Sequence, residues 1–296
     1  MMSEGYQHCQ RVVRSRSWSP FAPLPPRLPP ATSGTSSHAN ISTLAVQLSG
    51  HLRDVFMSSL TVKPLTVTLA ALRAAYDVSL FVHTWHTLDA STPSYRTRPA
   101  GANASSDESV ESLMRLLQPT MVLVQRQGAT ALQGRGPTLF SGTHISYQGM
   151  QYLYHGIAST VWMRRCHERK TRRSYDLVLR LRPDVYRVGP TQPYQLLSQL
   201  RACHAPKLLY GELADPGSTI TAADNVLWAV PETFDAIFLG IYGSFDAIYE
   251  HNTFRPPQMI LQVLSDLNLT NRLCQSCRLL KRESKGRVYT RRLCLK

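Results

Sequence analysis

The chain has 296 residues with a formal net charge of +14, and 43% of its residues are hydrophobic. This length and apolar content suit one large domain with a substantial core, which we predict over residues 41–272. No apolar stretch reaches the roughly 18 residues that a membrane-spanning helix requires, which argues against a transmembrane segment in this sequence.

Two segments flank the predicted domain and differ from it in composition. Residues 1–40 are rich in proline, serine and arginine, which predicts disorder and is shared by transit peptides and by misassigned gene starts. Residues 273–296 form a basic tail with a Cys274-x-x-Cys277 pair, for which a zinc site and a disulfide both stay open. The positive charge gathers in this tail and in residues 164–173, which favours solvated surfaces over a nucleic-acid site.

Strand and helix patterns alternate from residue 41 onward. Buried strands are predicted near residues 41–49, 76–85 and 120–125, and shorter ones at 207–210 and 225–230. Helices are predicted as two short pieces over 54–75, broken by Pro64, then over 111–117 and 146–173. From Pro231 onward the chain is predicted to be helical to its end, with helical spacing over 233–249 and 257–267 and a turn at 251–256. Residues 88–110 and 128–142 read as long loops. This order predicts an α/β fold with a layered, mostly parallel sheet and helices on both faces.

Residues 175–186 are the most informative segment. In a strand, Leu177, Leu179 and Leu181 share one face, whereas Arg180, Arg182 and Asp184 share the other. Three charges on one face of a buried strand are costly without partners, so they indicate an anion or metal site at the strand end, or a structural Arg–Asp pair.

The sequence carries no P-loop, no G-x-G-x-x-G after a strand, no G-x-S-x-G elbow and no H-E-x-x-H. Three short motifs lie on predicted strands or at their ends instead: S-G-x-x-R at 49–53, F-V-H-T-W at 81–85 and Y-D-x-V-x-R-x-R-P-D at 175–184. Their order and spacing resemble a family of GT-A-type glycosyltransferases found in bacteria, algae and large viruses, over residues 44–268. The resemblance implies a nucleotide-sugar donor and a glycan or glycoconjugate acceptor.

The resemblance also implies roles for residues that match its motifs. Gly50 lets the backbone approach the nucleotide, and Arg53, Arg180 and Arg182 are candidates for contacting the base or diphosphate. Asp184 is the candidate ligand for Mn²⁺ or Mg²⁺ and a candidate catalytic carboxylate, although Arg182 stands where a D-x-D motif has its first acid.

Three further residues have two readings each. Asp224, before the strand at 225–230, is either a second catalytic carboxylate or an ordinary turn residue. His83 and Trp85 either line a sugar pocket or belong to the core. Two other functions stay open: a non-catalytic nucleotide-sugar or carbohydrate-binding protein of the same fold, and a nucleic-acid-binding protein. The compartment is not fixed by the sequence, and the resemblance implies the Golgi or secretory lumen.

Overall fold

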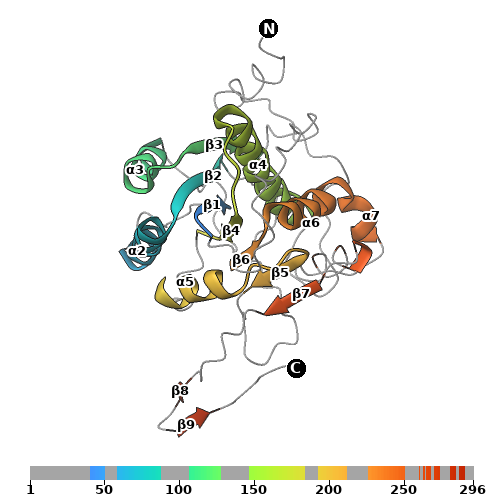
Figure 1. Cartoon of the computed structure of the whole chain (residues 1–296). Coiled ribbons are helices and arrows are strands. Elements are labelled where there is room, and N and C mark those ends of the chain that lie inside the picture. Colours follow the sequence, from blue (N-terminus) through green and yellow to red (C-terminus); the bar gives the residue numbers. More distant parts are fainter. Residues whose placement is uncertain are drawn as a thin grey trace.

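Seven strands form one sheet at the centre of the molecule (Figure 1). The computed structural model describes residues 41–50, 59–87, 107–127, 147–183, 193–211 and 226–250, together with 260, 263, 265–267, 270–273, 281–284 and 287–290. The sheet order is β3-β2-β1-β4-β6-β5-β7. The strands are β1 (Thr43–Ser49), β2 (Asp77–Thr87), β3 (Met121–Arg126), β4 (Leu177–Leu181), β5 (Leu208–Gly211), β6 (Val226–Ala229) and β7 (Thr270–Leu273).

The sheet is mixed but mostly parallel, as predicted. Strands β3, β2, β1 and β4 run parallel to one another, and β5 is parallel to β7. Among the described strands of this sheet, β6 alone runs against its neighbours, since it pairs antiparallel with both β4 and β5. The α/β class is therefore confirmed, with one reversed strand that the sequence did not reveal.

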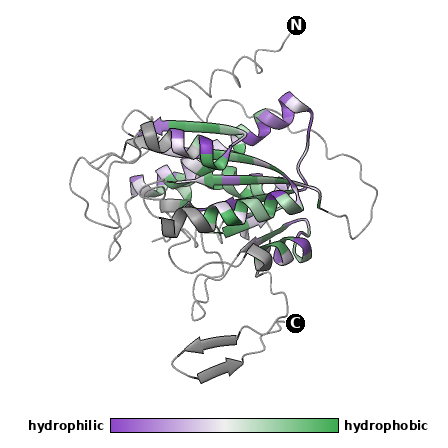
Figure 2. Ribbon diagram, turned by 90° about the vertical axis from the view of Figure 1, so that its left-hand side faces the viewer, coloured by the Kyte–Doolittle hydropathy of each residue, from purple (hydrophilic) through white to green (hydrophobic). Residues whose placement is uncertain are grey.

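Helices cover both faces of the sheet, so the domain has three layers (Figures 1 and 2). Figure 2 shows hydrophobic strands in the middle and more polar surfaces outward on the helices. One face carries α2 (Ser59–Ala75), α3 (Asp107–Leu117) and α5 (Pro193–Ala202). The other carries α4 (Tyr147–Thr171), α6 (Pro231–Gly243) and α7 (Phe245–Glu250).

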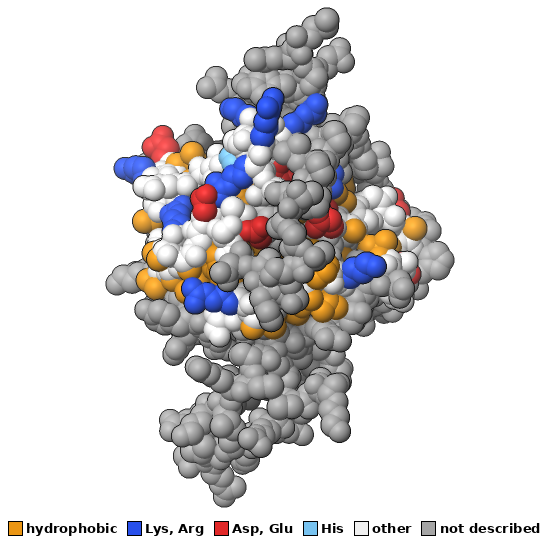
Figure 3. Space-filling model, viewed as in Figure 1, with side chains coloured by type: hydrophobic (Ala, Val, Ile, Leu, Met, Phe, Trp, Pro, Cys, Tyr) orange, Lys and Arg blue, Asp and Glu red, His pale blue; other side chains and the backbone are white. Residues whose placement is uncertain are grey.

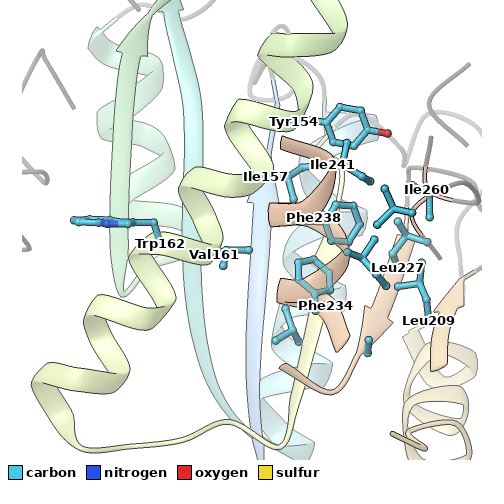
Figure 4. Packing of buried hydrophobic residues seen from close by; sticks show 14 of the residues in the cluster. Tyr154, Ile157, Val161, Trp162, Leu209, Leu227, Phe234, Phe238, Ile241 and Ile260 are labelled. Atoms are coloured by element: carbon cyan, nitrogen blue, oxygen red, sulfur yellow. The ribbon is translucent and has the colours of Figure 1, made fainter. Parts of the chain in front are cut away.

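Strict alternation along the strands divides the core into two clusters. On β4, Leu177, Leu179 and Leu181 pack on the α2 face, while Val178 packs on the α4 face. Figure 4 shows the second cluster, where Phe234 and Phe238 of α6 lie among residues of α4, β5 and β6. The side chain of Trp162 leaves α4 on the side away from these residues.

The structure corrects three expectations about the elements. First, residues 59–75 form one helix through Pro64, the sixth residue of the helix. Proline at this position removes a backbone hydrogen bond and crowds the preceding turn, and burial of the apolar row from Leu65 to Leu72 against the sheet offsets that cost. Second, the predicted helix from Pro231 ends at Gly243 and is followed by the separate helix α7. Third, the chain does not stay helical to its end.

Strands replace the predicted helices in the last part of the chain. After residue 269 the described residues form β7 at the edge of the sheet, then β8 (Lys281–Ser284) and β9 (Arg287–Thr290) as an antiparallel pair. Cys274 and Cys277 lie outside the described residues.

A buried charge network was also unexpected, because we predicted residues 164–173 to be a solvated helix face. Arg164 has no exposed surface and bonds the carboxylates of Glu168, at 2.5 Å, and Asp235 of α6. Burial alone would lower the pKa of Arg164, but the two carboxylates outweigh it and raise the pKa. Arg165 adds a second bond to Asp235 at 2.8 Å. The network ties α4 to α6, since each carboxylate offsets the cost of a buried guanidinium.

The end of α4 keeps the solvated character that was expected. Figure 3 shows Lys and Arg side chains gathered at the top of the view, where α4 ends in Figure 1. The last turn contains Arg169 and Lys170, and cations at this end suit the helix dipole. No helix within the described ranges combines the length and apolarity needed to cross a bilayer.

Two cysteines within the domain are disulfide-bonded. Cys166 is buried on α4, and Cys203 follows α5 and packs against the cluster on the opposite face. The sequence placed the disulfide or zinc alternatives at the tail and treated these two cysteines as scattered.

Candidate functional site at the carboxyl ends of β1, β2 and β4

The point where the sheet reverses its order lies between β1 and β4. Successive strands β1, β2 and β3 extend to one side of β1, whereas β4 lies on its other side. Crevices outside the carboxyl ends of strands at such a point are where open α/β sheets bind ligands. The three motifs identified in the sequence follow or lie on β1, β2 and β4, so their strand ends meet at this place.

Gly50 ends β1 in a conformation that favours glycine. Its φ is +138°, and a Cβ added there would lie 3.6 Å from Cδ of Pro183, which follows β4. The Gly50 N–H donates to the carbonyl oxygen of His83 at 3.3 Å. Gly50 therefore links the end of β1 to His83 of β2 and lies near Pro183 after β4, and its missing side chain leaves the backbone accessible at the reversal point, as a close approach by a ligand requires.

The structure brings five of the predicted residues to this part of the sheet. Gly50 follows β1, His83 of β2 is aligned with the last residue of β1, and Trp85 lies two residues further along β2, where its ring meets that of His83. Arg180 on β4 is opposite Gln47 of β1, and Arg182 follows β4, half-buried. Three predicted residues, Arg53, Asp184 and Asp224, lie outside the described residues, as do most of the predicted loops at 88–110 and 128–142.

The third motif divides into two parts with different tasks. Tyr175 and Asp176 precede β4, at the edge opposite the reversal point. Asp176 Oδ2 accepts hydrogen bonds from the backbone N–H of Ser42 and of Thr43, each at 2.9 Å, and from both hydroxyls. Partial burial would raise the pKa of Asp176, but these bonds lower it below its ordinary value. This end of the motif therefore fastens β1 to β4.

Arg180 lies deeper than the sequence suggested. Its side chain has no exposed surface and sits on the α4 face of the sheet, two residues before Arg182. The predicted alternation is correct, but only Arg182 and the residues after it reach the strand end.

A chain of polar side chains runs beneath α4 from His83 to α6. The Gln125 side-chain oxygen, at the end of β3, lies 2.8 Å from Nε2 of His83 and 2.8 Å from Nε2 of His155. His155 Nδ1 lies 3.2 Å from the Tyr242 hydroxyl of α6. With the amide placed in this way, both imidazoles carry their proton on Nε2, and each Nδ1 is an acceptor.

Burial keeps these imidazoles neutral. It lowers the pKa of His83 to about 4, although the hydrogen bond with Gln125 acts in the opposite direction. Burial, and secondarily the positive charge that His83 would carry, lowers the pKa of His155 well below its ordinary value. Burial also raises the pKa of Tyr242, so its hydroxyl stays protonated. The chain is thus an uncharged network at neutral pH.

Aromatic rings fix the position of His83 within this network. Trp85 meets the His83 ring edge-on at 4.6 Å between centroids and also packs against His155 and Tyr152. Trp85 is 1% exposed. The rings therefore hold the imidazoles in place from within the core.

Sequence reasoning missed most of this network. Gln125, His155 and Tyr242 come from three elements, and none of them lies in one of the three motifs. The signals in the sequence were a glutamine at the end of an otherwise apolar predicted strand and a histidine inside a long predicted helix.

The described residues do not by themselves form a site for Mn²⁺ or Mg²⁺. These ions prefer several oxygen ligands, carboxylates above all. In the described ranges no three His, Cys, Asp or Glu side chains come together. A cation at this edge would depend on Asp184, beyond the last described residue of this segment.

The fold and site together define a three-layer α/β protein with polar groups at the reversal point of a mostly parallel sheet. The chain matches no protein-family model and no curated protein.

Proposed function

We propose that this protein is a GT-A-type glycosyltransferase that moves a sugar from a nucleotide-sugar donor to a glycan or glycoconjugate acceptor. The observation that carries the proposal is the meeting of the three motif strands at the reversal point, where Gly50 lies beside Pro183. Ligands of open α/β sheets bind there, and the residues that the resemblance assigns to the donor begin at these strand ends.

The charge of Arg182 near this edge supports a phosphate-bearing ligand. Arg182 follows β4 and is half-buried, whereas Arg180, two residues earlier on the same face, has no exposed surface. A guanidinium matches the geometry of phosphate oxygens and stays charged at every physiological pH. In the proposal Arg182 and Arg53 neutralise the donor diphosphate together with a cation held by Asp184, and Asp224 activates the acceptor hydroxyl.

The disulfides support residence in an oxidising compartment. Cys166 and Cys203 are both disulfide-bonded, and such bonds persist in secretory and extracellular proteins far more than in the cytosol. We therefore place the reaction in the secretory lumen, consistent with a glycoconjugate acceptor.

The test is nucleotide release from a panel of nucleotide sugars, measured with and without Mn²⁺. Wild type should turn over one donor, and Asp184→Ala or Arg53→Ala should lower the rate by about 100-fold or more. The first variant removes the proposed ligand of the cation and the second removes a guanidinium, and both cations stabilise the leaving diphosphate. Asp246→Ala and Arg201→Ala are matched controls, since both residues are exposed on helices α7 and α5. Failure of the whole panel to bind or react would refute the proposal.

A non-catalytic binding protein of the same fold is the second candidate. The residue that favours it is Arg182, which occupies the position of the first acid in a D-x-D motif. Binding of one nucleotide sugar without hydrolysis or transfer, with or without Mn²⁺, would establish this candidate instead.

A further inference from the structure

Gly156 of α4 lies directly over Ser49 of β1 and His83 of β2. A Cβ built on Gly156 would lie 2.9 Å from Nδ1 of His83 and 3.6 Å from Cβ of Ser49. The first distance is too short for a real methyl group, and the His83 ring is held in place by Gln125 and Trp85. Glycine is therefore required here because the helix passes directly above the imidazole.

Two buried polar atoms lie beneath Gly156. Ser49 and His83 are aligned across β1 and β2 and share the α4 face, with exposed fractions of 1% and 0%. Within the described part of the chain, neither Ser49 Oγ nor His83 Nδ1 has a hydrogen-bond partner. Leaving a buried hydroxyl and a buried imidazole nitrogen without partners is unfavourable, because both lose their bonds to water on folding.

The two atoms have complementary capacities. His83 Nδ1 accepts a hydrogen bond when Nε2 donates to Gln125, and the serine hydroxyl both donates and accepts. A single hydroxyl between them can donate to Nδ1 and accept from Ser49, which satisfies both. We propose that Ser49 and His83 form a two-point site for one hydroxyl group, supplied by a buried water or by an alcohol group of a ligand bound at the reversal point.

The assignment to a ligand alcohol rests on the proposed function, since a nucleotide sugar carries hydroxyls on both its ribose and its sugar. The assignment to a buried water does not depend on the proposed function. The site adjoins Gly50, so an alcohol group of a ligand that crosses the ends of β1 and β4 would lie next to it.

The experiment compares unfolding midpoints of the full-length wild type and Ser49→Ala in urea, alone and with UDP or GDP. If a water fills the site, Ser49→Ala lowers the midpoint without nucleotide, because the variant breaks the bridge. If a ligand alcohol fills the site, Ser49→Ala changes the midpoint without nucleotide only a little. The variant is then stabilised less by one of the two nucleotides, because its apparent Kd for that nucleotide rises by about 10-fold. If the wild type binds neither nucleotide, the proposed function is refuted. The midpoints measured without nucleotide still test whether a water fills the site.

Thr84→Val is the control substitution. Thr84 is as buried as His83, and its hydroxyl also lacks a partner in the described residues, but it lies on the opposite face of β2. Removing that hydroxyl should leave the midpoint unchanged or raise it. If Ser49→Ala behaves like Thr84→Val and nucleotide affinity is unaltered, the two-point site does not exist.

A crystal structure of the full chain distinguishes a bridging hydroxyl from a direct hydrogen bond between Ser49 and His83. One density peak within hydrogen-bond distance of both Ser49 Oγ and His83 Nδ1 supports the site. A direct bond from the serine hydroxyl to the imidazole, with no peak between them, overturns it.

Discussion

Lowering the pH from 7 to 5 is expected to destabilise the fold through His83. Its pKa falls from 6.5 to about 4 on folding, so between these values the unfolded state binds more protons than the folded state. Stability is therefore full above pH 6.5 and is lost as the pH falls toward 4. With about 1.4 kcal/mol for each pH unit, His83 alone costs about 2 kcal/mol at pH 5 and about 3 kcal/mol at pH 4.

His155 should deepen this loss, because its pKa is also lowered and the two rings share Gln125. Asp176 acts in a different range. Its pKa lies below 3.8 in the folded state, so the stability that it contributes is present above 3.8 and lost only at lower pH. The interval between pH 6.5 and 4.5 therefore isolates the histidines from this carboxylate.

Urea unfolding followed by tryptophan fluorescence at pH 7, 6 and 5 measures the effect. The variant His83→Gln removes the titrating group, so its stability should fall less with decreasing pH, by about 2 kcal/mol at pH 5, although it is less stable at pH 7. Equal pH dependence in the wild type and in His83→Gln would refute the assignment of a buried, neutral His83.

Three further predictions concern other parts of the fold. Asp235→Ala should lower the free energy of unfolding by about 3–5 kcal/mol, because the buried Arg164 then keeps only one of its two carboxylate partners. The control Asp246→Ala removes an exposed carboxylate and should change the free energy by less than about 0.5 kcal/mol. Similar urea midpoints for the two variants would contradict this prediction. Gly50→Ala should cost about 1–2 kcal/mol because of its positive φ, whereas Gly243→Ala, with open space around its added methyl, should cost little in the same assay. Cys203→Ser should lower the thermal midpoint without reductant and have a smaller effect in its presence; an equal effect in both would argue against the disulfide.

Local patterns in the sequence predicted most strands and the longest helix. Strand β4 is recognisable because leucine alternates with other residues, and α4 because apolar positions recur over many turns. Long-range partners carry no such signal. Arg164 is separated by 71 residues from Asp235, so its side chain reads as part of an exposed basic run until the fold brings the carboxylate beside it.

The order of the sheet was also beyond the reach of local patterns. Strand β6 has four buried residues that fit a parallel or an antiparallel neighbour equally well. Its direction is tied to its place in the sheet, where it lies between β4 and β5 and pairs antiparallel with both. The same limit applies to the candidate site, because Gln125 and His155 lie 30 residues apart and meet only when α4 crosses β2 and β3.

The neutral state of His83 has a consequence for the chemistry that this edge can perform. Arg180 and Arg182 already place positive charge on the α4 face of β4, and a cationic imidazole two strands away would add to it. Burial instead leaves His83 as an uncharged acceptor beside the Ser49 hydroxyl. An edge with the Arg182 guanidinium after β4 and the proposed hydroxyl-binding pair on β1 and β2 would be complementary to a ligand that carries both phosphates and alcohols. A nucleotide sugar meets this description, whereas a simple polyanion would use only Arg182. Weakening of nucleotide binding by Ser49→Ala would therefore favour the sugar donor over a general anion.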